Sequence, residues 1–229
     1  MRRTLCYDDL AMGHRVNRAS SRAVILDWDG TLLNSFHADA CAYLQMFGAL
    51  GIGWGLTELA QHYSPDWHNV YRAANVPREC WGEADRLWRH FYRAQRPILQ
   101  PGARSVVQEL ARKYRLALVT SGSGGRVRAQ LRAFALADLF PVCVFGDEVP
   151  RRKPHPAALL LAMRRLGLEP AACVYIGDAP EDVKMARFAG VHSVGVLGHS
   201  PVPERLRAAR PDALISRITE LPGLLSRSQ

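Results

Sequence analysis

The 229-residue chain has no apolar run that approaches the about 20 residues of a membrane-spanning helix. Its five cysteines are odd in number and lack CxxC spacing, which argues against a disulfide framework and against a zinc site. Residues 1–22 have no apolar segment typical of a secretory signal, and we expect a flexible basic leader there. The sequence therefore predicts a cytoplasmic protein with no membrane partner.

Lysine is almost absent, since only three of the 30 basic residues are lysines. The net charge of +9 and the pI of about 9.8 raise the question of nucleic-acid binding. However, the basic residues are spread along the chain, and no basic stretch is interleaved with aromatic residues to form a stacking platform. We expect no nucleic-acid partner, and a basic surface suits a small anionic substrate equally well.

The segment 34–100 differs in composition from the rest of the chain. It holds four of the five tryptophans and little strand character, and apolar residues recur at helical spacing over 38–50 and 79–94. Pro97 and the pair Pro101-Gly102 close the segment. We predict an all-helical insertion over 34–100 in a core made of residues 23–33 and 101–225.

From residue 103 onward, short apolar runs alternate with helical patterns of about ten residues. This alternation predicts right-handed crossovers and an α/β fold with a doubly wound, parallel, Rossmann-like sheet. In such sheets the ligand site lies at the carboxyl ends of the strands. The predicted strands of this part are 116–119, 142–145, 174–176, 193–196 and 213–215.

Two acids follow the first apolar run, Val24–Leu26, which reads as a buried strand. Side chains alternate along a strand, so Asp27 and Asp29 leave its end on the same side. Two adjacent acids repel each other unless a cation compensates, and Mg²⁺ accepts oxygen ligands. The alternative is an ordinary Asp-Gly surface turn formed with Gly30.

Two further strand ends carry groups suited to an anion. The strand 116–119 ends in Thr120-Ser121-Gly122, whose hydroxyls and amides precede a helix and favour anion binding. The alternative is a plain helix N-cap with a flexible turn. Lys153 follows the next strand and precedes a proline. Its ammonium would lie over the strand ends, whereas the alternative is a solvated basic loop.

The fourth strand end carries Asp178, with Asp182 four residues later. Asp178 is placed as a further metal ligand, and Asp182 as a helix N-terminal acid or a partner that orients other groups. The alternative is a capping box formed by Asp178 and Glu181. Because these groups follow successive strands of one parallel sheet, the set predicts a Mg²⁺ and phosphoryl site.

These motifs resemble the four motifs of the haloacid dehalogenase (HAD) superfamily over residues 23–215. The matching segments are Asp27-Trp28-Asp29-Gly30-Thr31-Leu32, Thr120-Ser121-Gly122, Lys153-Pro154 and Gly177-Asp178-x-x-x-Asp182. The helical insertion resembles the type-1 cap of phosphoglycolate-phosphatase-like members. Trp28 stands where the family more usually has Phe.

The resemblance implies a Mg²⁺-dependent phosphatase that hydrolyses a small phosphorylated metabolite through an aspartyl-phosphate. Asp27 is implied as the nucleophile and Asp29 as the general acid and base. Thr120 and the amides of Ser121 and Gly122 are implied to bind the phosphoryl oxygens, and Lys153 to neutralise charge. The implied metal ligands are Asp27, the carbonyl of Asp29, and Asp178, with Asp182 in support.

Two other functions compete with a phosphatase. The acid at Asp29 argues against dehalogenase and phosphonate-cleaving relatives, but beta-phosphoglucomutases also have it. Their fourth motif usually reads Glu-Asp, whereas this chain has Gly177-Asp178. A non-catalytic phosphate-ligand-binding protein would be expected to have lost Asp27, Asp29 or Lys153, and all are present.

The sequence does not indicate the oligomeric state or the substrate. The candidates for the pocket that holds the leaving group of the substrate are His37, Trp54, His68, Tyr71 and Arg72.

Overall fold

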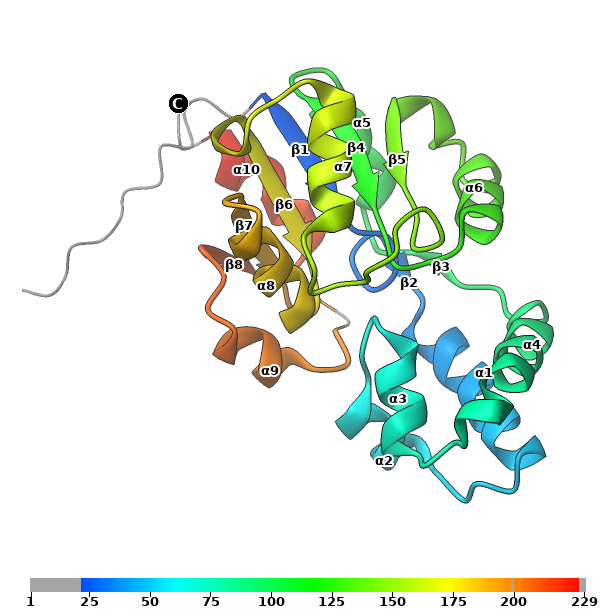
Figure 1. Ribbon diagram of the computed structural model, residues 1–229. Coiled ribbons are helices and arrows are strands. Elements are labelled where there is room, and N and C mark those ends of the chain that lie inside the picture. Colours follow the sequence, from blue (N-terminus) through cyan, green and yellow to red (C-terminus); the bar gives the residue numbers. More distant parts are fainter. Residues whose placement is uncertain (1–21, 199, 227–229) are drawn as a thin grey trace, which may run out of the picture.

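The structure is a computed structural model that describes residues 22–198 and 200–226, so the expected leader lies outside the described residues except for Arg22. Figure 1 shows a larger part built on a sheet and, beside its lower edge, a smaller part made of α1–α4. We call the smaller part, residues 34–100, the cap and the remainder the core. Among the described residues, no helix is long and apolar enough to cross a membrane.

The core holds a six-stranded sheet in the order β5-β4-β1-β6-β7-β8, in which all paired neighbours are parallel. The central position of β1 follows from its pairing with both β4 and β6, for example Ile25 with Ala117 and with Tyr175. This topology confirms the predicted Rossmann-like α/β fold. The strands are β1 (Ala23–Leu26), β4 (Arg115–Val119), β5 (Val142–Val144), β6 (Cys173–Gly177), β7 (His192–Val196) and β8 (Ala213–Ile215).

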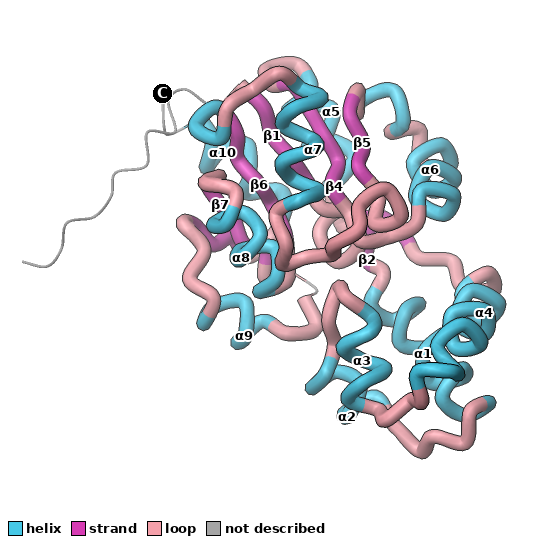
Figure 2. The backbone as a smooth tube through the Cα atoms, viewed as in Figure 1, coloured by secondary structure: helices cyan, strands magenta, loops and turns pink. Residues whose placement is uncertain are grey.

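Helices cover both faces of the sheet, as Figure 2 shows. Val24 and Leu26 pack with residues of α5, α6 and α10, whereas Ala23 and Ile25 point to the other face and pack with α7 and α8. All four β1 side chains are fully buried, each contributing about 1–3 kcal/mol of hydrophobic stabilisation. The core helices are α5 (Ala103–Ala111), α6 (Gly124–Ala133), α7 (Ala157–Leu166), α8 (Pro180–Phe188), α9 (Pro203–Ala208) and α10 (Leu221–Ser226).

The cap is joined to the core through a short antiparallel pair of strands, in which Leu33 pairs with Leu99. Both connections between the two parts therefore run side by side. The connecting strands are β2 (Leu33–Asn34) and β3 (Ile98–Leu99), and the cap helices are α1 (Phe36–Ala49), α2 (Leu56–His62), α3 (Trp67–Ala73) and α4 (Trp81–Tyr92). Short 3-10 turns lie at Arg78–Cys80 in the cap and at Ala137–Leu139, Pro170–Ala172 and Ile218–Glu220 in the core.

The cap has a small hydrophobic core of its own. Its fully buried centre includes Met46, Phe47 and Leu59. The four cap tryptophans are partly buried and pack against this cluster. The cap therefore has its own packed interior, separate from the two clusters that flank the sheet.

Candidate active site

The turn after β1 brings the first two acids to the carboxyl edge of the sheet. The amide of Asp27 donates to the carbonyl of Ile176 at 2.9 Å, which prolongs the β1–β6 pairing by one residue. Gly30 has φ +83°, and a Cβ there would lie 2.1 Å from Oδ2 of Asp178. Thr31 Oγ1 donates to Oδ1 of Asp178 at 3.2 Å. The turn is thus packed against the loop after β6, which excludes the ordinary surface turn.

Lys153 lies at the centre of this edge. Its Nζ lies 2.5 Å from Oδ1 of Asp27 and 2.8 Å from Oδ1 of Asp182, and its side chain is 3% exposed. Burial alone would lower the pKa of this ammonium, but the carboxylates of Asp182 and Asp27 raise it. The alternative of a solvated basic loop is therefore wrong.

Asp182 has a supporting position. Its Oδ1 accepts from the hydroxyl of Tyr175 at 2.9 Å, and its Oδ2 accepts from the amide of Ala179 at 3.0 Å. Together with Lys153, these contacts occupy both carboxylate oxygens. The helix α8 is thus capped by Ala179 and Asp182, so the alternative capping box of Asp178 and Glu181 is wrong.

Three buried carboxylates converge beside this single ammonium. Asp27, Asp178 and Asp182 each offer an oxygen, and these oxygens lie within 4.8 Å of one another. Burial raises the pKa of Asp27 to about 7 against the opposing effect of Lys153. Burial, with the charges of Asp27 and Asp182, raises the pKa of Asp178 well above its usual range. An excess of negative charge on hard oxygen ligands fits a divalent cation such as Mg²⁺.

The loop after β4 lies at the same edge. Thr120 is buried, and its Oγ1 accepts from the amide of Gly122 at 3.0 Å. Ser121 Oγ is buried, and no partner is found for it among the described residues. A buried hydroxyl without a partner is costly in isolation, so this loop fits a phosphoryl oxygen as the missing acceptor. Helix α6 begins directly after the loop, at Gly124.

Asp29 has a partner that the sequence did not indicate. Arg126, in the first turn of α6, donates from Nη1 to Oδ1 of Asp29 at 2.9 Å and from Nη2 to Oδ2 at 2.6 Å. This two-point contact is the strong form of a charged hydrogen bond. The carboxylate of Asp29 thus faces α6, apart from the cluster formed by the three other acids.

A cavity of about 150 Å³ lies between this edge and the cap, lined by residues of both parts. Of the five pocket candidates from the sequence, Tyr71 lines the cavity, whereas His37, Trp54, His68 and Arg72 do not. The cap contributes instead a set of aromatic and acidic side chains that had not been predicted, which includes Asp39, Tyr43, Tyr63, Trp67 and Trp88.

Asp39 is an acid with a raised pKa on the cap side of the cavity. The hydroxyl of Tyr63 donates to its Oδ2 at 2.5 Å. Burial raises the pKa of Asp39 to about 6, although the hydrogen bond from Tyr63 opposes this effect. The cavity therefore has an acidic group on its cap side, opposite the carboxyl edge of the sheet and among several aromatic side chains.

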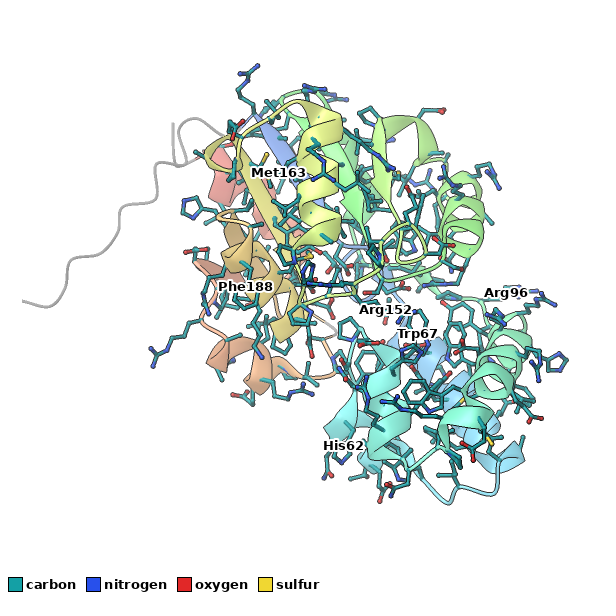
Figure 3. The ribbon with its side chains drawn as sticks, viewed as in Figure 1. His62, Trp67, Arg96, Arg152, Met163 and Phe188 are labelled. Atoms are coloured by element: carbon teal, nitrogen blue, oxygen red, sulfur yellow. The ribbon has the colours of Figure 1, made fainter. Side chains whose placement is uncertain are left out.

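The cap and the core also contact each other at the loop after β5 and at α8. Arg152 precedes Lys153 and lies over the ring of Trp67, with its guanidinium carbon 3.8 Å from the ring centroid; Figure 3 shows the two side chains at the boundary between the parts. Arg152 also lies 3.1 Å from Nδ1 of His68. The hydroxyl of Ser64 in the cap donates to Glu181 of α8 at 3.3 Å.

The comparisons with known proteins agree with this architecture. The model of the family described as Haloacid dehalogenase-like hydrolase matches residues 24–196. A phosphoglycolate phosphatase from Nitrosococcus oceani is 28% identical over 217 residues, which cover 90% of this chain and 96% of the relative. The pyrophosphatase PpaX from Bacillus pumilus is 25% identical over 215 residues, which cover 92% of this chain and 99% of the relative.

The solved structures include a haloacid dehalogenase-like hydrolase from Streptococcus pneumoniae, with a TM-score of 0.80, 21% identity and coverage of 90% of this chain and 99% of that chain. Fold and site thus define a capped α/β hydrolase. The chain belongs to the haloacid dehalogenase-like hydrolase family, and within it resembles the phosphoglycolate phosphatases. The expectation of a phosphatase-type enzyme of this family is confirmed.

Proposed function

We propose that this protein is a Mg²⁺-dependent phosphatase that hydrolyses a small phosphate monoester through an aspartyl-phosphate on Asp27. The observation that carries the proposal is the placement of Lys153 between Asp27 and Asp182. A carboxylate held beside an ammonium at the edge of the cavity is oriented for attack on phosphorus. The relatives named phosphoglycolate phosphatase support a phosphate ester as substrate.

Each side chain has a task that follows from its position. Asp27 attacks phosphorus, and Asp29 gives a proton to the leaving oxygen and later takes one from the attacking water. Lys153 neutralises charge on Asp27 and the phosphoryl oxygens. The Ser121 hydroxyl donates to a phosphoryl oxygen, next to Thr120. These roles suit phosphoryl transfer, which depends mainly on positioning and charge compensation.

Asp27 and Asp178 would hold the metal ion, together with the carbonyl of Asp29. Bound there, Mg²⁺ supplies the positive charge that offsets the repulsion between the carboxylates and the phosphoryl group. Asp182 has both oxygens engaged by Lys153, Tyr175 and the Ala179 amide, so its task is to orient Lys153.

Gly177 argues for a hydrolase over the mutase alternative. A Cβ at this position would lie 2.4 Å from Cγ of Asp182, closer than real Cβ contacts allow. The Glu that usually stands at this position in the beta-phosphoglucomutases would therefore displace Asp182, and with it the contact to Lys153. The geometry of this site is thus matched to a glycine in the fourth motif.

The test is phosphate release from a panel of phosphorylated metabolites and from 4-nitrophenyl phosphate, with Mg²⁺ or with EDTA. We expect turnover with Mg²⁺, loss of turnover in EDTA, and loss of turnover in Asp27→Asn. For Asp29→Asn we expect the aspartyl-phosphate to accumulate, visible as a mass increase of the intact protein. A wild-type protein that releases no phosphate from any of these esters with Mg²⁺ would refute the proposal.

A further inference from the structure

Arg126 is a charged residue of the site to which the proposed reaction assigns no task. It binds both oxygens of Asp29, at 2.9 and 2.6 Å, in a partly shielded position where the side chains are 18% and 24% exposed. A single hydrogen bond lets a carboxylate rotate, whereas two parallel bonds fix both its position and its plane. Arg126 therefore determines how the carboxylate of Asp29 is presented.

Arg126 is itself held by a residue one helical turn later. Its Nη1 donates to Oε1 of Gln130 at 3.2 Å. The same Oε1 accepts from the indole nitrogen of Trp28 at 2.9 Å. Trp28 is fully buried and directly precedes Asp29 in the chain. The contacts thus form a closed ring from Trp28 through Gln130 and Arg126 to Asp29.

The ring explains a feature of the first motif. The residue between the two acids is a tryptophan, where the resembling family more usually has phenylalanine. A phenylalanine fills an apolar space but has no donor for Gln130. The indole N–H lets Trp28 fix the amide that in turn fixes Arg126.

The cap also touches Arg126. Tyr92, the last residue of α4, lies with its ring centroid 5.2 Å from the guanidinium carbon, and its hydroxyl lies 3.4 Å from Nη1. Contact between a guanidinium and an aromatic ring is attractive. Because Tyr92 belongs to the cap, docking of the cap adds a further support to the guanidinium.

We propose that Arg126, braced by Gln130 and Trp28, is a positioning residue that aligns Asp29 for proton transfer. The inference rests on the proposed phosphatase function. As the bond from Asp27 to phosphorus forms and the bond to the leaving oxygen breaks, the proton of Asp29 passes to that oxygen. In the second half-reaction the oxygen of the attacking water bonds to phosphorus, the bond from Asp27 to phosphorus breaks to release inorganic phosphate, and a proton of that water returns to Asp29. A carboxylate oxygen has a second lone pair, so Asp29 exchanges this proton while Arg126 holds it.

The leaving group provides a direct test. Phenolate is a poor leaving group that needs a proton, whereas 4-nitrophenolate is a weaker base and leaves without one. Loss of alignment of Asp29 therefore affects phenyl phosphate far more than 4-nitrophenyl phosphate. For Arg126→Ala and Arg126→Gln we expect kcat/KM to fall about 30- to 100-fold with phenyl phosphate. With 4-nitrophenyl phosphate we expect a fall below about fivefold.

Arg128→Ala is the matched control, since Arg128 lies on the same helix with an exposed side chain near Glu148. We expect this variant to keep the wild-type rates with both esters. Equal losses for the two esters in both Arg126 variants, or no loss, would overturn the inference while leaving the proposed phosphatase intact. Absence of wild-type turnover would instead refute the proposed function.

Trp28→Phe tests the brace without touching the charged pair. It keeps an aromatic ring in the buried space and removes the donor to Gln130 together with part of the indole volume. We expect kcat/KM to fall about threefold more with phenyl phosphate than with 4-nitrophenyl phosphate. Adding Trp28→Phe to Arg126→Ala should cause no further loss. Additive losses, or equal losses for both esters in Trp28→Phe, would contradict the ring as a positioning device.

Discussion

Replacement of Lys153 by methionine tests the charge balance of the site. The side chain keeps nearly its length, but the ammonium that lies 2.5 Å from Asp27 and 2.8 Å from Asp182 is lost. Breaking a buried ion pair by removing one partner costs about 3–5 kcal/mol, because the other charges remain buried and uncompensated. Proton uptake by Asp27, whose pKa is already raised to about 7, relieves part of this cost. We therefore expect the free energy of unfolding to fall by about 3 kcal/mol at pH 7.

The assay is urea unfolding in EDTA, followed by far-UV circular dichroism. With an m value of about 3 kcal/mol per molar, the midpoint for Lys153→Met falls by about 1 M. Adding Mg²⁺ raises the midpoint again, since a ligand that binds only the folded state stabilises it. In the same variant we expect kcat to fall about 100- to 1,000-fold, the usual cost of removing one charge-stabilising donor.

Lys184→Met is the control for this experiment. Lys184 lies on α8, as Asp182 does, and its side chain is exposed. We expect its urea midpoint and its kcat to equal those of the wild type. A Lys153→Met midpoint within 0.2 M of wild type (about 0.6 kcal/mol at this m value), or a kcat within about threefold, would show that the ammonium compensates little charge.

Three further predictions concern the turn, the cap cavity and the cap boundary. Gly30→Ala places a methyl group 2.1 Å from Asp178 at φ +83°, so we expect activity below about 1% and a lower melting temperature in differential scanning calorimetry. Burial raises the pKa of Asp39 to about 6 from its ordinary 3.8, so its contribution to stability is present below pH 4 and is lost as the pH rises to 6. For Asp39→Asn, the free energy of unfolding from urea titrations should decline between pH 4 and 7 by up to about 3 kcal/mol less than in the wild type. The same dependence on pH in both proteins would contradict the raised pKa of Asp39. Arg152→Ala removes the contact with Trp67, so hydrogen exchange should speed up over residues 64–70 while β1 stays protected; equal rates in the variant and wild type would argue against this contact as a cap support.

The sheet was predictable because its signals are local and repeated. Buried runs such as Val24–Leu26 are short and apolar, and each is followed by a helical pattern of sufficient length to cross over. Parallel strands place their carboxyl ends at one edge, so Asp27, Lys153 and Asp178 were expected together despite their separation in the chain. The structure places Lys153 in contact with Asp27, and Asp178 in the same acidic cluster.

The cap side of the site and Arg126 could not be predicted in the same way. Arg126 is one of 27 arginines, so its residue type carries almost no information. The only available signal was its place in the first turn of the helix after the Thr120 loop. Asp39 has the spacing of an ordinary helical residue, and it becomes part of the cavity through the angle at which the cap docks, which no local pattern specifies.

The position of β1 between β4 and β6 also bears on synthesis of the protein. One flank of β1 is supplied by Arg115–Val119 and the other by Cys173–Gly177, which leave the ribosome almost 60 residues apart. Until the later segment emerges, the strand that leads to Asp27 has an open side, and the ammonium of Lys153 has no Asp182 beside it. The contacts of Lys153 with both Asp27 and Asp182 can thus form only when about four fifths of the polypeptide, up to Asp182, has been made.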